Sequence, residues 1–122
     1  MRLNPRYSGS RDPFLHMREL TAVELQAYLD STPEQPMLLD VRESWEFDRA
    51  CIAGSTLVPM RSVPGHLQEL DPGRETVVIC HHGIRSRMVC LFLESQGFSN
   101  VVNLSGGVDA WALDVDRKMP TY

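Results

Sequence analysis

The sequence lacks several features, and each absence argues against a class of protein. No apolar run approaches the roughly 20 residues that a membrane-spanning helix needs. Residues 1–6 lack the apolar centre of a secretory signal. Basic residues are not in excess: 12 Lys and Arg stand against 16 Asp and Glu, and the net charge of −4 argues against a nucleic-acid binder. We therefore expect a cytoplasmic protein that binds neither nucleic acid nor membrane.

Cysteine is also scarce. The three cysteines, Cys51, Cys80 and Cys90, are odd in number and unevenly spaced, so reduced thiols are expected rather than a disulfide framework. The sequence contains neither a Cys-x-x-Cys nor a His-x-x-x-His spacing. No structural zinc site is therefore predicted.

The length and composition of the chain suit one compact domain. A length of 122 residues with 43% hydrophobic residues is enough for a single core and leaves no room for a second domain. The first residues combine Pro, Gly, Ser and Arg without periodicity. We interpret residues 1–14 as a loosely held N-terminal arm and residues 15–122 as the domain.

Strand and helix patterns alternate along that domain. Thr21-Ala22-Val23-Glu24 is a capping box, and the apolar residues after it repeat at helical spacing. Strands are predicted at residues 37–41, 56–58, 76–79 and 101–104. Further helical segments are predicted at residues 44–49 (capped by Ser44), 63–70 and 108–115, and around Met88, Leu91, Phe92 and Ser95. This alternation predicts an α/β fold with a parallel central sheet flanked by helices on both faces.

The loop after the strand at 76–79 carries the candidate chemistry. In such sheets, ligands bind beyond the carboxyl ends of the strands. The residues there are Cys80-His81-His82-Gly83-Ile84-Arg85-Ser86. The N–H groups at the start of the following helix favour an anion, and therefore a thiolate at Cys80. The alternative is that Cys80 is a small buried residue at a strand end.

The spacing Cys-x-x-Gly-x-Arg-Ser resembles the active-site loop of rhodanese-family sulfurtransferases. Other segments agree with the family in its order, over roughly Leu15 to Trp111. They are Leu38-Leu39-Asp40-Val41-Arg42 with Glu46 after it, Ile52-Ala53-Gly54-Ser55, and Leu104-Ser105-Gly106-Gly107-Val108-Asp109-Ala110-Trp111. The chain is therefore identified as a single rhodanese-like domain.

The resemblance implies a sulfurtransferase with a covalent intermediate. The Cys80 thiolate would take the outer sulfur of a donor such as thiosulfate or a persulfide, and the Cys80 persulfide would pass that sulfur to a thiol or protein acceptor, or to cyanide in an assay. Neither a metal nor an organic cofactor is implied.

The resemblance also implies roles for the loop. The backbone from His81 to Ser86 would bind the transferred sulfur, with Gly83 allowing an N–H to turn inward. Arg85 would pair with an oxyanionic donor, and Ser86 would cap the helix or donate to the sulfur. The side chains of His81 and His82 either raise the local positive charge or point outward, and we favour the second. Substrate-binding residues are therefore His81, His82, Gly83, Ile84, Arg85 and Ser86.

Residues outside the loop receive supporting or packing roles. Asp40 and Arg42 are expected to form an ion pair beside the site, with donor contact by Arg42 left open. Cys90 is expected to fill the core, and Trp45 and Trp111 are expected to be packing residues rather than ligand platforms. Cys51 stands where the family usually has histidine, so it either fills a small gap, which we favour, or accepts sulfur from Cys80.

Two rival functions share this fold. The first is a non-catalytic binding or regulatory module, but such domains often lack the loop cysteine that this chain keeps. The second is a cysteine-dependent phosphatase, whose loop resembles Cys-x-x-x-x-x-Arg and is one residue longer than the loop from Cys80 to Arg85. A shorter loop suits one sulfur atom better than a tetrahedral phosphate.

Overall fold

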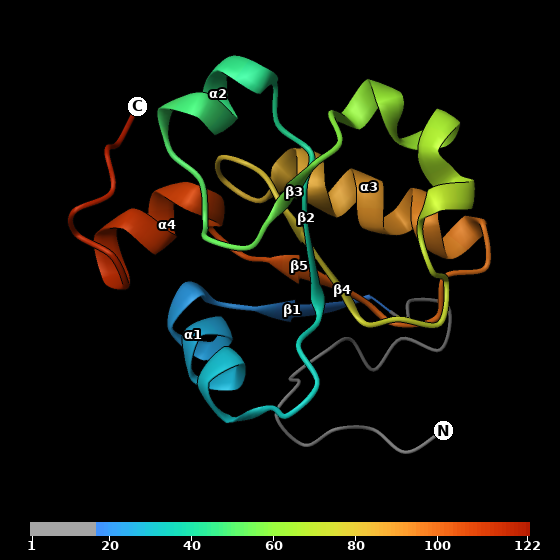
Figure 1. The fold of residues 1–122 in the computed structure, drawn as a ribbon, viewed down its shortest axis with the longest axis horizontal. Coiled ribbons are helices and arrows are strands. Elements are labelled where there is room, and N and C mark those ends of the chain that lie inside the picture. Colours follow the sequence, from blue (N-terminus) through green and yellow to red (C-terminus); the bar gives the residue numbers. More distant parts are fainter. Residues whose placement is uncertain (1–16) are drawn as a thin grey trace.

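A computed structural model describes residues 17–122 (Figure 1). The expected arm, residues 1–14, lies outside the described residues. The strands are β1 (Arg18–Leu20), β2 (Met37–Asp40), β3 (Thr56–Leu57), β4 (Thr76–Ile79) and β5 (Val101–Leu104). The helices are α1 (Ala22–Ser31), α2 (Ser44–Arg49), the 3-10 helix η1 (Met60–Glu69), α3 (Ile84–Ser95) and α4 (Gly107–Asp114). Among these residues, no helix is long and apolar enough to cross a membrane.

All five strands pair in parallel in the order β1-β5-β4-β2-β3, as the alternating pattern predicted. The chain runs outward from β2 to β3 and then returns over β2 to β4, from which it continues to β5. The connections after β2 and β4 therefore leave in opposite directions. Parallel sheets bind ligands at such a switch point, where the carboxyl ends of neighbouring strands leave a crevice.

The sheet is buried on both faces because its apolar residues alternate between two clusters. In β4, Val78 and the following Cys80 contribute to one cluster, whereas Val77 and Ile79 contribute to the other. The first cluster is covered by α3 and η1, and the second by α1 and α4 (Figure 1). This alternation follows from the two-residue repeat of a strand, and it explains why β4 is apolar throughout.

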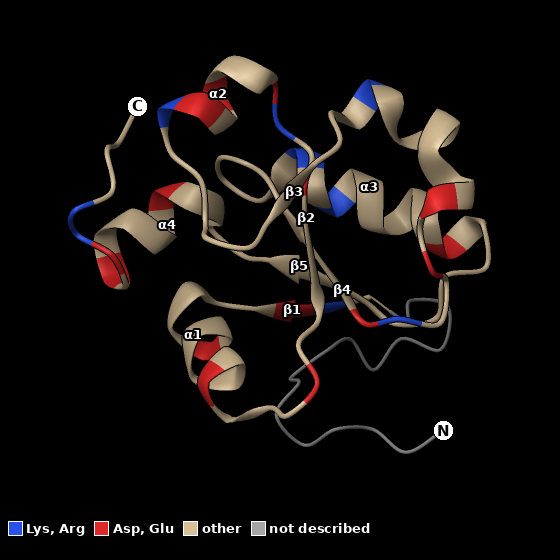
Figure 2. Cartoon of the chain, in the orientation of Figure 1, with Lys and Arg blue, Asp and Glu red and all other residues tan. Residues whose placement is uncertain are grey.

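Charged side chains are distributed over separate elements (Figure 2). Acidic residues lie on α1, α2 and the end of η1, whereas the first turns of α3 carry basic residues. Basic positions also occur on β1, in the loop after β2 and near the C-terminus, so among the described residues they are not confined to one element (Figure 2).

Several local predictions need correction. Strand β1 was not predicted, because three residues are too few to show a period. Ser44 is the first residue of α2, and Glu43 is its N-cap, paired with Glu46 in a capping box. Residues expected to form part of an α-helix at 63–70 lie mostly in the 3-10 helix, which contains Pro64. Met88 and Leu91, taken as the apolar face of α3, are 58% and 42% exposed.

Candidate active site

The loop after β4 places Cys80 at the switch point. Val41 continues the pairing of β2 with β4, because its N–H donates to the carbonyl of Ile79 at 2.9 Å. Cys80 therefore lies beside the residues that follow β2, namely Val41 and Arg42. Its side chain is 1% exposed. Residues 40–42 and 80–86, separate in sequence, thus meet at one edge of the sheet, as predicted.

Two groups of the loop hold the Cys80 sulfur. The N–H of Gly83 donates to Sγ at 3.0 Å, and the Ser86 hydroxyl lies 3.2 Å from Sγ. Gly83 is the N-cap of α3 and has a φ of 101°, a left-handed conformation that glycine adopts without strain. The predicted inward turn at Gly83 is therefore confirmed. Ser86 does not cap α3, because it lies inside the helix.

Asn103 connects the loop to β5. Its Oδ1 accepts a hydrogen bond from the Ser86 hydroxyl at 2.5 Å, and its Nδ2 donates to the Gly83 carbonyl at 3.1 Å. Because Ser86 has one hydroxyl hydrogen and gives it to Asn103, the thiol form of Cys80 donates to Ser86. For a thiolate, the Ser86 hydrogen has to turn from Asn103 to Sγ. Asn103 was missed by sequence reasoning, although a buried amide within an otherwise apolar strand is a recognisable signal.

The backbone of the loop packs directly on the turn before α4. The N–H of Val108 donates to the Cys80 carbonyl at 2.9 Å, and the N–H of Asp109 donates to the His81 carbonyl at 3.0 Å. A Cβ at Gly107 would lie 2.3 Å from the His81 carbonyl oxygen, so only glycine fits there. The turn at Gly106-Gly107 is therefore needed for the loop to sit against α4.

Arg85 projects toward α2 and forms a two-point ion pair with Glu46. Its two terminal nitrogens donate to the Glu46 carboxylate oxygens at 2.7 and 2.9 Å. The hydrogen bonds from Arg85 outweigh burial and lower the pKa of Glu46 to about 2. The same bonds raise the pKa of Arg85 above its ordinary value. A role for Glu46 was missed at the sequence level, because 39 residues separate it from Arg85.

Asp40 and Arg42 form the predicted ion pair, and both side chains are inaccessible to solvent. Arg42 Nη2 donates to Asp40 Oδ2 at 2.6 Å, and Arg42 also donates to the carbonyls of Glu46 and Ala50. Although burial opposes the charge, the hydrogen bonds to Asp40 and Tyr122 keep the pKa of Arg42 above its ordinary value. Arg42 therefore holds one carbonyl inside α2 and the carbonyl of its C-cap, and it is closed to solvent.

Tyr122 closes the polar cluster, and sequence reasoning missed it. Its hydroxyl accepts from Arg42 at 2.6 Å and donates to Glu46 Oε2 at 3.0 Å. Its ring stacks on the His81 ring, with centroids 4.0 Å apart and planes 8° from parallel. Trp45 meets the same ring edge-on at 5.7 Å and is 61% exposed, so it packs against Tyr122 at the surface.

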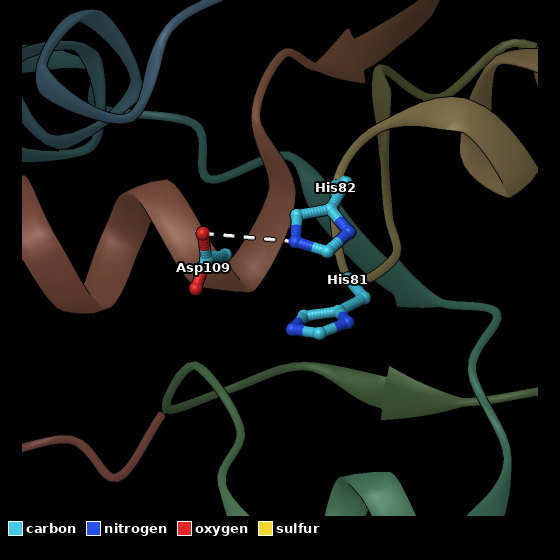
Figure 3. A group of neighbouring side chains, drawn as sticks. All are labelled: His81, His82 and Asp109. Atoms are coloured by element: carbon cyan, nitrogen blue, oxygen red, sulfur yellow. Dashed lines mark ion pairs between the residues drawn. The ribbon is translucent and has the colours of Figure 1, made fainter. Parts of the chain in front are cut away.

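The two histidine side chains lie together at the rim of the loop. His81 and His82 stack at 3.9 Å between ring centroids, and His82 Nε2 is 3.7 Å from Asp109 Oδ2 (Figure 3). Burial, followed by the neighbouring His82, lowers the pKa of His81 below its ordinary value, so its ring is neutral at pH 7. His82 points outward as expected, with a side chain 58% exposed, whereas His81 is covered in part by Tyr122.

The remaining candidates are resolved by burial. Ile84 is 73% exposed at the start of α3, so it offers the loop its backbone rather than its side chain. Cys90 is fully buried and Trp111 is 6% exposed, which confirms both as core residues. Burial raises the pKa of the Cys90 thiol far above its ordinary value, so Cys90 is inert as a nucleophile. Cys51 is a half-buried free thiol, and its exchange with Cys80 stays a prediction.

Comparison with known proteins shows the family to which this chain belongs. Residues 21–114 match the family described as the Rhodanese-like domain. The chain is 33% identical over 96 residues to a sulfurtransferase of Allochromatium vinosum, covering 79% of this chain and 89% of that protein. It is 39% identical over 93 residues to the Rhodanese-like/PpiC domain-containing protein 12 of Arabidopsis thaliana, covering 73% of this chain but only 31% of that longer protein.

The solved structures agree with the sequence match. A rhodanese-like domain protein from Staphylococcus aureus superposes with a TM-score of 0.73 at 28% identity, covering 85% of this chain and 97% of that one. The α/β domain fold is thus shared with this solved structure. The chain belongs to the rhodanese-like domain family.

Proposed function

We propose that this protein is a sulfurtransferase that carries a sulfane sulfur as a persulfide on Cys80. The observation that supports it most is the setting of the Cys80 sulfur, which accepts the Gly83 N–H at 3.0 Å and lies 3.2 Å from the Ser86 hydroxyl. The fixed Gly83 N–H stabilises negative charge on the buried sulfur, and the Ser86 hydroxyl adds a second donor once its hydrogen turns from Asn103. That setting suits first a thiolate and then the terminal sulfur of a persulfide.

The reaction proceeds in two displacements. The Cys80 thiolate attacks the outer sulfur of the donor, a new sulfur–sulfur bond forms, and the donor's own sulfur–sulfur bond breaks. Its electron pair leaves with sulfite when the donor is thiosulfate, or with a thiolate when the donor is a persulfide. An acceptor thiolate, or cyanide in an assay, then attacks the terminal sulfur and releases Cys80 as a thiolate. Neither displacement needs an external oxidant or reductant, so the reaction requires no redox cofactor.

Arg85 gives the site its selectivity for anionic donors. A guanidinium has five N–H groups, and the ion pair with Glu46 uses one on each terminal nitrogen. The rest are available to an oxyanionic group of the donor. The pair of Asp40 and Arg42 supports the position of Glu46. Arg42 donates to the carbonyls of Glu46 and Ala50 and therefore holds the orientation of α2. Since the acceptor must be a reduced thiol, on a small molecule or a protein, we place the reaction in the cytoplasm.

Replacement of the nucleophile tests this proposal. In Cys80→Ser, serine occupies a similar volume but cannot form a persulfide, so formation of thiocyanate from thiosulfate and cyanide should fall to background. Circular dichroism checks that the fold is retained. Cys51→Ala serves as the matched control and should keep its thiocyanate activity. Turnover of Cys80→Ser near the wild-type rate would rule out Cys80 as the sulfur carrier.

A further inference from the structure

Three side chains that the proposed reaction does not use converge at the rim of the catalytic loop. His81 and His82 come from the loop, and Asp109 comes from the first turn of α4 (Figure 3). One potential ligand atom from each lies within 4.8 Å of the other two. In Figure 3 both imidazole rings turn a nitrogen toward the side on which the Asp109 carboxylate lies. Two imidazoles and one carboxylate form a ligand set that zinc and related divalent transition metals accept.

The backbone fixes the spacing of these three residues. The N–H of Asp109 donates to the His81 carbonyl at 3.0 Å, and Gly107 packs against that carbonyl so closely that no side chain would fit. The loop and α4 therefore cannot separate without breaking these contacts. A ligand set held in place by backbone contacts loses less conformational entropy when an ion binds.

The His81 side chain supplies an independent observation. Its Nε2 atom is buried and has no hydrogen-bond partner among the described residues. An unsatisfied buried polar atom costs about 1–3 kcal/mol, and a bound ion would satisfy it. The ring is also held in orientation by stacking on Tyr122, with planes 8° from parallel. His81 is therefore a preoriented ligand.

One pair of ligand atoms lies near the separation that a metal ion needs. Ligand atoms at about 2.0–2.2 Å from one tetrahedral zinc lie roughly 3.3–3.5 Å from each other. His82 Nε2 and Asp109 Oδ2 are 3.7 Å apart, and all three ligand atoms lie within 4.8 Å of one another. Because the His82 side chain is 58% exposed, it can turn toward the ion by giving up part of its stacking on His81. Three protein ligands would leave a coordination position open for water.

We propose that His81, His82 and Asp109 form a binding site for a divalent transition metal ion of the zinc class at the rim of the catalytic loop. This inference goes beyond the proposed function and does not depend on it, because neither sulfur displacement requires a metal.

Metal titration of the full chain tests the site. The parent protein is Cys80→Ser/Cys51→Ala, so that the thiolates of the loop and its neighbourhood cannot bind the ion. Zn²⁺ is titrated in competition with a chromophoric chelator. We expect one equivalent of Zn²⁺ to bind, and His82→Asn or Asp109→Asn to weaken that binding by more than about tenfold, since even the loss of an outer-shell partner of a metal ligand costs 10–100-fold.

A second histidine–carboxylate pair provides the matched control. His66 Nε2 lies 3.7 Å from Glu69 Oε2 on the exposed side of η1, the same separation as in the pair of His82 and Asp109. His66→Asn should change Zn²⁺ affinity by less than about twofold. Co²⁺ should give visible bands of nitrogen and oxygen ligation without a thiolate charge-transfer band. The site would be refuted if the parent protein binds no Zn²⁺, or if His66→Asn weakens binding as much as His82→Asn.

Discussion

Two arginine–carboxylate pairs lie beside the catalytic loop, and they differ in their surroundings. The pair of Asp40 and Arg42 is sealed from solvent, with side chains 1% and 0% exposed. In the pair of Glu46 and Arg85, the arginine side chain is 34% exposed while the glutamate is 5% exposed. Tyr122 links the two pairs through its hydroxyl, which accepts from Arg42 and donates to Glu46.

The difference in exposure indicates different roles for the two arginines. Arg42 donates its N–H groups to Asp40, to Tyr122 and to the carbonyls of Glu46 and Ala50. It therefore affects the catalytic loop only by positioning Glu46. Arg85 is held by Glu46, and its side chain stays 34% exposed. We infer that the inner pair sets the geometry of α2 and that the outer pair meets the donor.

Breaking the inner pair should have the largest effect. Asp40→Asn leaves the Arg42 charge buried without compensation, and such losses cost about 3–5 kcal/mol. Urea denaturation should show a decrease of this size in the free energy of unfolding. Arg61→Ala is the matched control: its pair with Glu43 is exposed, with the arginine side chain 74% accessible, so its loss should cost less than about 1 kcal/mol. Equal effects of the two substitutions would contradict the distinction between buried and exposed pairs.

The outer pair should make stability depend on pH. Because the pKa of Glu46 is lowered from 4.5 to about 2 in the folded state, its contribution is complete above 4.5 and is lost as the pH falls toward 2. Glu46→Gln should therefore be less stable than the wild type at pH 7, by about 3 kcal/mol, and the gap should narrow as the pH falls. Urea denaturation of both proteins from pH 7 to pH 3 measures the difference in their free energies of unfolding. A gap that stays constant over this range would show that the charge of Glu46 does not stabilise the fold.

Arg85→Lys should separate charge from shape. Lysine keeps the positive charge but loses the planar fork, so kcat/KM for thiosulfate should fall by about tenfold or more, in line with about 1.5–3 kcal/mol for a hydrogen bond to a charged group. Arg85→Ala should lower it further and slow the alkylation of Cys80, since Arg85 and Cys80 interact electrostatically. Steady-state kinetics and the rate of iodoacetamide labelling test both. Unchanged values in both variants would mean that Arg85 serves only to hold Glu46.

The smallest effect is expected at the link between the pairs. Tyr122→Phe keeps the ring that stacks on His81 but removes the hydroxyl between Arg42 and Glu46. A hydrogen bond to a charged group contributes about 1.5–3 kcal/mol. Because Arg42 and Glu46 keep their ion-pair partners Asp40 and Arg85, a decrease in stability near or below the low end of that range should appear by thermal denaturation. Tyr122→Leu, which also removes the stacking, should cost more. If the two variants are equally stable, the ring contributes nothing beyond its hydroxyl.

The sequence was sufficient for the parts of this site that are contiguous. The strand at Thr76–Ile79 and the capping box at Thr21 and Glu24 follow from local rules, and the structure confirms them. The alternation of strands and helices predicted Cys80 beyond the carboxyl end of its strand, but not the strand order that makes this position the switch point. The family resemblance is confirmed by the match over residues 21–114.

The parts that sequence reasoning missed depend on contacts between distant residues. Glu46 meets Arg85 across 39 positions, and Tyr122 meets Glu46 across 76, so no local pattern relates them. Asn103 gave a signal, a polar residue in an apolar strand, but its partners Ser86 and Gly83 depend on the register of β5 with β4. Trp45 was predicted to be a packing residue, but its partner Tyr122 is distant in sequence, so no local pattern shows that it packs at the surface.

The intact mass of the protein after exposure to a sulfane-sulfur donor tests the central proposal most directly. Wild-type protein treated with thiosulfate or a persulfide should gain the mass of one sulfur atom, peptide mapping should locate it on Cys80, and a thiol acceptor should remove it. Cys80→Ser should gain nothing under the same conditions. A wild-type protein that gains no sulfur from either donor, or that carries it on Cys51 with Cys80 unmodified, would contradict the account.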